Sequence, residues 1–245
     1  MSGHSKWSTI KRKKAKVDAQ RGKIFTKLAK EIIIAAKQGG GDPEANMRLK
    51  NAIAKAKEAN LPNDNIQRAI QKGAGELDGV NYEEIVYEGY GPGGAAVMLD
   101  IMTDNRNRTA AEIRHFFSRF GGNLGETGCV SWMFETNGLI IVEKADNPGL
   151  DADEFLLLAL DAGAVDIREE DDSLEVITEQ AMLSQVLDVL EVEGIKASHS
   201  SITKIPKNTV SLSGEQAEQM MKLMDALEDH DDVQDVYANC EIEDE

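Results

Sequence analysis

The first residues of the chain carry a dense group of cations whose chemistry suits a polyanion. We call residues 3–16 the basic leader. It contains no acid, and its cations are Lys6, Lys11, Arg12, Lys13, Lys14 and Lys16. So many neighbouring cations repel one another unless counterions or phosphates compensate them. Trp7 adds a ring that stacks on a base or covers the core of a helical domain, and both roles stay open. The alternative is a solvated tail or a localisation signal.

A second cluster with binding chemistry begins at residue 104. It reads Asp104-Asn105-Arg106-Asn107-Arg108-Thr109, and Arg114, His115 and Arg119 follow it. Asn and Arg side chains at a strand-to-helix junction hydrogen-bond phosphates or bases, and a helix N-terminus favours anions. The local alternative is that Asp104 or Asn107 caps the helix while the arginines pair with nearby acids. The predicted nucleic-acid-binding residues are therefore Lys6, Trp7, Lys11, Arg12, Lys13, Lys14, Lys16, Arg21, Lys23, Arg106, Arg108 and Arg114.

Charge is divided unevenly along the 245 residues, whose formal net charge is −17. Residues 1–80 hold 17 Lys and Arg against 8 Asp and Glu, a balance of +9. The rest of the chain holds 10 against 36, a balance of −26. Phosphate backbones avoid an acidic body, so this division predicts one basic binding module on a body that limits non-specific coating of nucleic acid.

Other chemistries lack a signature in the sequence. It contains no Gly-x-Ser-x-Gly elbow, no P-loop and no paired histidines, so we predict that the chain is not an enzyme. The glycine cluster at 91–94 lacks the Lys-Ser/Thr ending of a phosphate loop and predicts a hairpin turn. Cys129 and Cys240 are far apart and the four histidines are isolated, which predicts reduced thiols, no metal and no cofactor.

The sequence also predicts a cytoplasmic protein with no membrane partner. No apolar run approaches the roughly 18 residues that a membrane helix needs. The cations near the N-terminus are not followed by the apolar region of a secretory signal.

The basic residues must be positioned by helices. Apolar side chains recur every three or four residues and predict a helix over 18–37, along which Arg21, Lys23, Lys27 and Lys30 extend the basic patch. Asp42-Pro43 predicts the start of a second helix with Met47 among its buried positions. A short third helix follows Pro62, and residues 1–80 form a basic helical domain.

From residue 82 the hydrophobic period becomes that of strands, which predicts an α+β fold. Residues 137–205 have the order β-α-β-β-α-β and predict a ferredoxin-like domain. Residues 81–136 and 206–245 form a second, discontinuous α+β domain of the same kind, into which 137–205 is inserted. A linear split into sequential domains is the alternative. In this scheme Val130–Phe134 is a strand and Asn137-Gly138 a turn.

Several motifs together resemble the YebC/PmpR family. They are Gly3-His4-Ser5-Lys6-Trp7, the Lys11–Lys16 run, Gly22-Lys23-Ile24-Phe25, the Asp104–Thr109 segment and Gly128-Cys129-Val130-Ser131-Trp132-Met133-Phe134. The resemblance covers essentially the whole chain. It implies a helical N-terminal domain followed by two α+β domains, and a DNA-binding transcriptional regulator. It also implies relatives that act in translation: mitochondrial members as translational activators, and bacterial ones at stalled ribosomes.

Three functions stay open at this point. The first is a transcriptional regulator bound to promoter DNA. The second is a ribosome-associated translation factor that binds ribosomal RNA and assists elongation. The physical argument alone favours this second function, because no helix-turn-helix recognition helix is evident, whereas the family resemblance favours the first. The third is a small-ligand-binding or enzymatic protein that uses an interdomain cleft. We expect a monomer or a weak oligomer.

Overall fold

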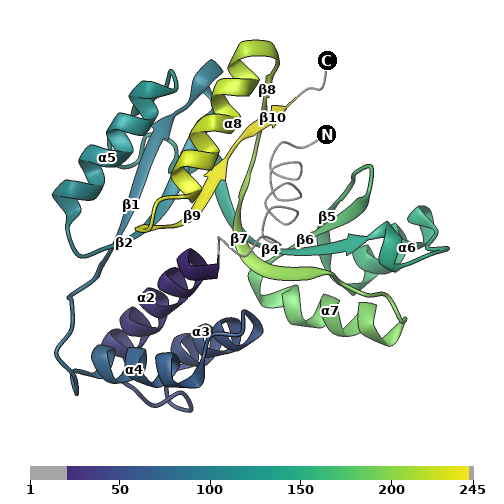
Figure 1. Cartoon of the computed structure of the whole chain (residues 1–245). Coiled ribbons are helices and arrows are strands. Elements are labelled where there is room, and N and C mark those ends of the chain that lie inside the picture. The colour runs from purple at the N-terminus through teal and green to yellow at the C-terminus, as the bar shows by residue number, and fades with distance from the viewer. Residues whose placement is uncertain (1–20, 243–245) are drawn as a thin grey trace.

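The described chain begins with three helices that pack on one another. The structure, a computed structural model, describes residues 21–242 and, for Arg21, the backbone alone. The helices are α2 (Arg21–Gly39), α3 (Met47–Glu58) and α4 (Asn63–Ala74) (Figure 1). Ile32, Leu49 and Ile66 lie at the centre of their common core. The three helices bury one another's apolar faces. Short amphipathic helices depend on such packing for their stability.

The close contact of α2 and α4 depends on Gly73. A Cβ atom at this position would overlap the carbonyl oxygen of Ile33 and lie 2.7 Å from Cβ of Ala36. Only a glycine lets the two helix backbones approach this closely.

The start of α3 differs from the prediction. Asn46, which is buried, caps the helix because its Oδ1 accepts a hydrogen bond from the backbone N–H of Leu49 at 3.1 Å. The helix therefore begins at Met47 and not at Pro43, and Met47 is 69% exposed rather than buried. Leu49 takes the buried place instead.

The first sheet combines strands from distant parts of the chain. Its order is β3-β1-β2-β9, and every neighbouring pair is antiparallel. The strands are β1 (Glu83–Tyr90), β2 (Ala96–Thr103), β3 (Asn123–Leu124) and β9 (Val233–Ala238). A short 3-10 turn (Pro92–Gly94) connects β1 to β2, and Gly93 adopts a φ of 66° there, which favours glycine.

Two helices cover one face of this sheet, as Figure 1 shows. They are α5 (Arg106–Arg119) and α8 (Gly214–Glu228). Phe117 of α5 and Met220 of α8 meet Leu99 of β2 in the core between the layers. Two further strands, β8 (Val210–Leu212) and β10 (Cys240–Ile242), pair in parallel.

The second sheet has the order β5-β6-β4-β7, again with antiparallel neighbours. Its strands are β4 (Phe134–Glu143), β5 (Ala164–Glu169), β6 (Ser173–Thr178) and β7 (His199–Pro206). Helix α6 (Ala152–Ala162) connects β4 to β5, and α7 (Leu183–Val192) connects β6 to β7; the 3-10 turns Lys144–Asp146 and Gln180–Met182 precede them. Phe155 of α6 and Val186 of α7 pack against Ile140 of β4.

The opposite face of the second sheet is also apolar. Side chains alternate between the two faces of a strand, so those next to Ile140 point away from α6 and α7. This second cluster consists of Leu139, Ile141, Ile177 and Ile205.

The chain before β4 differs from the predicted strand. Residues 131–133 form a 3-10 turn, and β4 starts only at Phe134. Backbone N–H groups here donate to a side chain, that of Glu88, so they are not available to a strand ladder. Asn137-Gly138 lies inside β4 and not in a turn, because both residues pair with β7.

The helical N-terminal region and the antiparallel sheets with their helices confirm the predicted α+β class. Between residues 21 and 242, no helix is long and apolar enough to cross a membrane.

Candidate nucleic-acid interface

The described residues include four of the predicted binding side chains. Seven others belong to the basic leader and lie outside the described residues: Lys6, Trp7, Lys11, Arg12, Lys13, Lys14 and Lys16. Arg21 is the first residue of α2, and its side chain also lies outside them. The structure places Lys23 on α2 and Arg106, Arg108 and Arg114 on α5.

Lysines of α2 hold this helix against the C-terminal end of α8. Nζ of Lys23 donates to the carbonyl of Asp229 at 3.1 Å and lies 3.4 Å from its carboxylate. Nζ of Lys27 donates to the carbonyl of Glu228 at 2.8 Å. Cations satisfy the last carbonyls of a helix and oppose the negative end of its dipole. These contacts fix α2, the helix that follows the basic leader in the sequence, on the acidic body.

Lys30 is buried and not part of an exposed patch. Only 5% of the residue is accessible, and its Nζ lies 2.6 Å from Oδ1 of Asp232. Nζ also donates to the carbonyls of Asp231 at 2.9 Å and Met102 at 3.4 Å. The expectation that Lys30 extends the basic patch is therefore wrong, because a buried carboxylate and two carbonyls compensate its charge.

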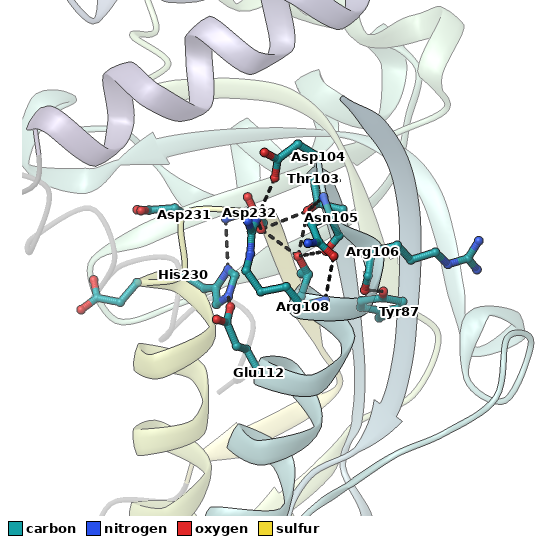
Figure 2. A network of polar contacts seen from close by, with 12 residues as sticks. Tyr87, Thr103, Asp104, Asn105, Arg106, Arg108, Glu112, His230, Asp231 and Asp232 are labelled. Atoms are coloured by element: carbon teal, nitrogen blue, oxygen red, sulfur yellow. Dashed lines mark hydrogen bonds and ion pairs between the residues drawn. The ribbon is translucent and has the colours of Figure 1, made fainter. Parts of the chain in front are cut away.

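Asp232 is the centre of the polar network drawn in Figure 2. Its Oδ2 accepts hydrogen bonds from Arg108 at 2.7 Å, from Oγ1 of Thr109 at 2.7 Å and from Oγ1 of Thr103 at 3.1 Å. Burial acts to raise the pKa of Asp232, but the hydrogen bonds from Lys30, Arg108 and Thr109 outweigh it and lower the pKa. The carboxylate is therefore ionised and joins α2, β2 and α5.

Arg108 is engaged by two carboxylates. Its guanidinium lies 2.7 Å from Asp232 and 2.8 Å from Asp104, and hydrogen bonds to these two acids raise its pKa. The cap of α5 is Asn105, whose Oδ1 accepts from the N–H of Arg108 at 3.1 Å, rather than Asp104 or Asn107. Arg108 therefore pairs with nearby acids, which was the local alternative to a nucleic-acid contact, although 43% of its side chain remains exposed.

Arg106 and Arg114 present their side chains to solvent on α5. Figure 2 shows the guanidinium of Arg106 pointing away from the Asp232 network, while its carbonyl accepts a hydrogen bond from the hydroxyl of Tyr87 at 3.3 Å. Burial raises the pKa of Tyr87, and the charges of Arg106 and Arg114 act in the opposite direction. Both arginines therefore lie close to Tyr87. Along the axis of α5, Arg106 and Arg114 are about 12 Å from each other.

His230 and Glu112 extend the network and were not predicted. Nε2 of His230 lies 2.7 Å from the carboxylate of Glu112, and Nδ1 accepts from the N–H of Asp232 at 3.0 Å. The neighbouring hollow has a volume of about 740 Å³ and is lined in part by Lys30, Arg108 and His230. No local sequence pattern identifies this site, because its members are more than 100 residues apart.

A fixed loop presents an aromatic ring to solvent. Glu88 is buried, and its carboxylate accepts hydrogen bonds of 2.8 Å from the N–H groups of Gly128, Val130 and Ser131. Burial acts to raise the pKa of Glu88, but these N–H groups outweigh it and lower the pKa. Trp132 on this loop is 62% exposed, and its Nε1 donates to the carbonyl of Cys129 at 3.1 Å. The indole is therefore held in place without being covered.

Helix α4 carries side chains able to read bases. Four residues, 59–62, join α3 to α4, which is the short connection typical of a helix-turn-helix. Asn63, Asn65 and Gln67 are exposed at the start of α4, and Arg68 and Lys72 are exposed further along. This is the short third helix predicted after Pro62, and Pro62 is its cap residue.

Known proteins resemble the chain over its whole length. The model described as TACO1/YebC protein N-terminal domain matches residues 5–76, and that of the TACO1/YebC second and third domain matches residues 82–240. Relatives from Pelotomaculum thermopropionicum and Carboxydothermus hydrogenoformans are 68% and 60% identical, with 100% of each chain covered. Both relatives are named probable transcriptional regulatory proteins.

A solved structure has the same architecture. The crystal structure of a conserved hypothetical protein from Aquifex aeolicus is 49% identical in sequence and superposes with a TM-score of 0.80. The match covers 94% of each of the two chains. Together the likenesses define a class of α+β proteins, and the two curated relatives in it are named probable transcriptional regulatory proteins. The chain belongs to the TACO1/YebC family, which confirms the resemblance seen in the sequence.

Proposed function

We propose that the protein is a nucleic-acid-binding regulator of gene expression that acts on promoter DNA in the cytoplasm. The division of charge carries this proposal: a balance of +9 over residues 1–80 stands against −26 over the remainder. Lys23, Lys27 and Lys30 bind the acidic body through α8 and Asp232. They hold the basic domain so that the leader, rather than α2, contacts the phosphates.

Exposed arginines of α5 supply a further contact in this proposal. Arg106 and Arg114 are accessible near Tyr87, whereas Arg108 is engaged by Asp104 and Asp232. We therefore assign phosphate contacts to Arg106 and Arg114, and assign to Arg108 the task of positioning α5.

Base recognition is assigned to the start of α4. Asn and Gln side chains form paired hydrogen bonds with adenine in the major groove, and Asn63, Asn65 and Gln67 are exposed there. Arg68 and Lys72 follow on the same helix and suit phosphate oxygens. The leader thus contributes affinity for any sequence, and α4 contributes discrimination.

Selection of bound duplexes from a randomised pool tests this assignment. Asn65→Ala and Gln67→Ala are expected to relax the preference at individual positions, at about 1–3 kcal/mol for each base that is no longer recognised. Gln71→Ala, on the same helix one turn later and also exposed, is the matched control and is expected to keep the preference. An unchanged preference in all three variants would show that α4 does not read bases.

The second candidate is a translation factor that binds ribosomal RNA. The exposed, fixed indole of Trp132 favours it, because an unpaired RNA base stacks on such a ring whereas a base in duplex DNA is already stacked. Sedimentation of lysates through a sucrose gradient separates the two candidates. Co-migration of the wild type with ribosomes, abolished on replacing Lys11, Arg12, Lys13 and Lys14 with Ala, supports the ribosomal role. If the wild type stays at the top and still shifts promoter DNA, that role fails.

A further inference from the structure

Helix α6 is apolar on its solvent side as well as on the side that packs on the second sheet. Phe155 and Ala159 are buried in the core beneath the helix, which is the contact that α6 needs for the fold. A helix that packs by one side normally carries polar residues on the other. Three leucines of α6 are instead 39%, 64% and 42% exposed: Leu156, Leu157 and Leu160. We call these three residues the leucine face.

The leucine face is one continuous patch. Side chains three and four residues apart are neighbours on a helix surface, so Leu160 adjoins both Leu156 and Leu157. Single exposed leucines are common on soluble proteins and need no explanation. A group of them with a polar border is typical of a surface that binds another molecule.

Acidic side chains border the leucine face. Asp153 and Glu154 are exposed in the first turn of α6 and Asp161 is exposed in its last turn, whereas the helix carries no Lys or Arg. Between residues 21 and 242, none of these three acids pairs with a cation. The acids of the first turn suit the N-terminal end of the helix dipole, but Asp161 lies at the C-terminal end, where a negative charge is unfavourable. A cation from outside the helix would compensate it.

The charge around the leucine face determines which class of molecule fits it. Residues 137–205, which include α6, contain 16 Asp and Glu but 4 Lys and Arg. This charge repels nucleic acid and the anionic surface of a membrane, and it attracts a cationic partner. Figure 1 shows α6 at the outer edge of the second sheet, away from α2, α3 and α4. A partner bound there leaves the basic helical domain accessible.

A second copy of the chain fits the leucine face less well than a short helix does. The basic helices of the chain are α2, α3 and α4, and among their described residues Met47 is the one large apolar side chain that is exposed. A stable interface buries about 800 Å² on each partner, which is far more than three leucines supply. A short amphipathic helix, which places a few apolar side chains on a small apolar surface, suits a patch of this size.

We propose that the leucine face of α6 docks a cationic amphipathic helix of a partner protein. Apolar side chains of that helix, three and four residues apart, pack on Leu157 and Leu160, and its lysines or arginines lie beside Glu154 and Asp161. The site goes beyond the proposed function, because it lies on the acidic body and binds protein rather than nucleic acid. It lets the chain attach to a basic protein while residues 1–80 remain accessible to a polyanion.

Binding of a designed peptide to the full chain tests this proposal. The probe is a fluorescent peptide of leucine and lysine with its leucines three and four residues apart, and anisotropy gives the dissociation constant. Leu157→Ser and, independently, Leu160→Ser are expected to weaken binding about fivefold to tenfold, because each removes part of the apolar contact. Glu154→Gln is expected to weaken it about twofold to threefold, since an exposed ion pair contributes little. A peptide of the same composition in which leucine and lysine alternate has no apolar helix face and should bind more weakly.

Val192→Ser is the matched control, because Val192 is 83% exposed on α7 between the exposed Glu191 and Glu193. It should leave the affinity for the peptide unchanged. An equal loss of affinity in Val192→Ser and both leucine variants would overturn the proposal, and so would equal binding of the two peptides, because the contact would then depend on charge alone. Self-association of the wild type that Leu157→Ser abolishes would also overturn it, since the leucine face would then bind a second copy.

Discussion

At the scale of single residues, Asp232 determines how the helical region sits on the first sheet. Its carboxylate accepts hydrogen bonds from Lys30 of α2, from Thr103 at the end of β2, and from Arg108 and Thr109 of α5. Removing one member of a buried ion pair leaves the other charge uncompensated, which costs more than the pair contributes. The network therefore acts as one unit whose loss affects every segment that it joins.

Asp232→Asn is expected to lower the free energy of unfolding by about 3 kcal/mol, because Lys30 would keep a buried charge without a carboxylate. Asp229→Asn is the matched control, since Asp229 pairs with Lys23 at an exposed site and its loss is expected to cost less than about 1 kcal/mol. Urea unfolding followed by circular dichroism gives both values. An equal loss of unfolding free energy in the two variants would show that Asp232 does not hold the helical region on the first sheet.

The lowered pKa of Asp232 also predicts a pH dependence. A carboxylate whose folded pKa lies below its unfolded value stabilises the protein fully above the unfolded pKa, and the contribution is lost as the pH falls through the folded pKa. The difference in melting temperature between wild type and Asp232→Asn should therefore shrink as the pH falls below about 4. Glu88, whose pKa is also lowered, adds to the acid sensitivity of both proteins. A difference that stays constant between pH 7 and strong acid would contradict this account.

At the scale of elements, the contact of α2 with α4 places the proposed base-reading helix. Gly73 of α4 lies against the backbone of Ile33 in α2, at a distance that leaves no room for a side chain. The packing of these helices is therefore specified by one small residue.

Gly73→Ala is expected to destabilise the protein by about 1–3 kcal/mol, although alanine is the better helix former, because the added methyl group overpacks the contact. Gly22→Ala in α2 is the control, since a Cβ atom there meets nothing within 4 Å. It is expected to be neutral or slightly stabilising. Thermal unfolding distinguishes the two variants, and a stabilised Gly73→Ala protein would show that the helices are free to separate.

The elements also show what a sequence predicts well. The strands and helices of the second sheet follow from alternation and turn residues, because these signals are local. The burial of Lys30 does not follow, since its partner Asp232 is 202 residues away. The local alternative named Asp104 or Asn107 as the cap of α5, but neighbouring Asx residues cap equally well, and only the geometry selects Asn105.

At the scale of the whole molecule, we propose that residues 137–205 form an independent, inserted domain. The matching family model covers a second and a third domain over residues 82–240, and β9 returns to the first sheet after the second sheet is complete. The ends of the insertion are neighbours, because Thr136 of β4 pairs with Lys204 of β7.

Replacing residues 137–203 with Asn-Gly is therefore expected to give a folded protein, since a two-residue turn joins antiparallel neighbours. In the control, the same turn joins Thr136 to Thr203, which shifts the register by one residue and reverses the faces of the strand. The first variant should unfold cooperatively on heating and the control should not. Failure of both would show that the two sheets fold only together.

The salt dependence of DNA binding tests the central claim most directly. If the leader contacts phosphates, the logarithm of the affinity falls steeply with the logarithm of the salt concentration, by about 0.9 for each phosphate neutralised. Replacing Lys11, Arg12, Lys13 and Lys14 with Ala is expected to weaken binding at low salt and to reduce the slope by roughly three to four. Exposed Lys222→Ala on α8 serves as the control and should leave the slope unchanged. A slope that is equal in the wild type and the fourfold variant would contradict the claim that the basic leader binds nucleic acid.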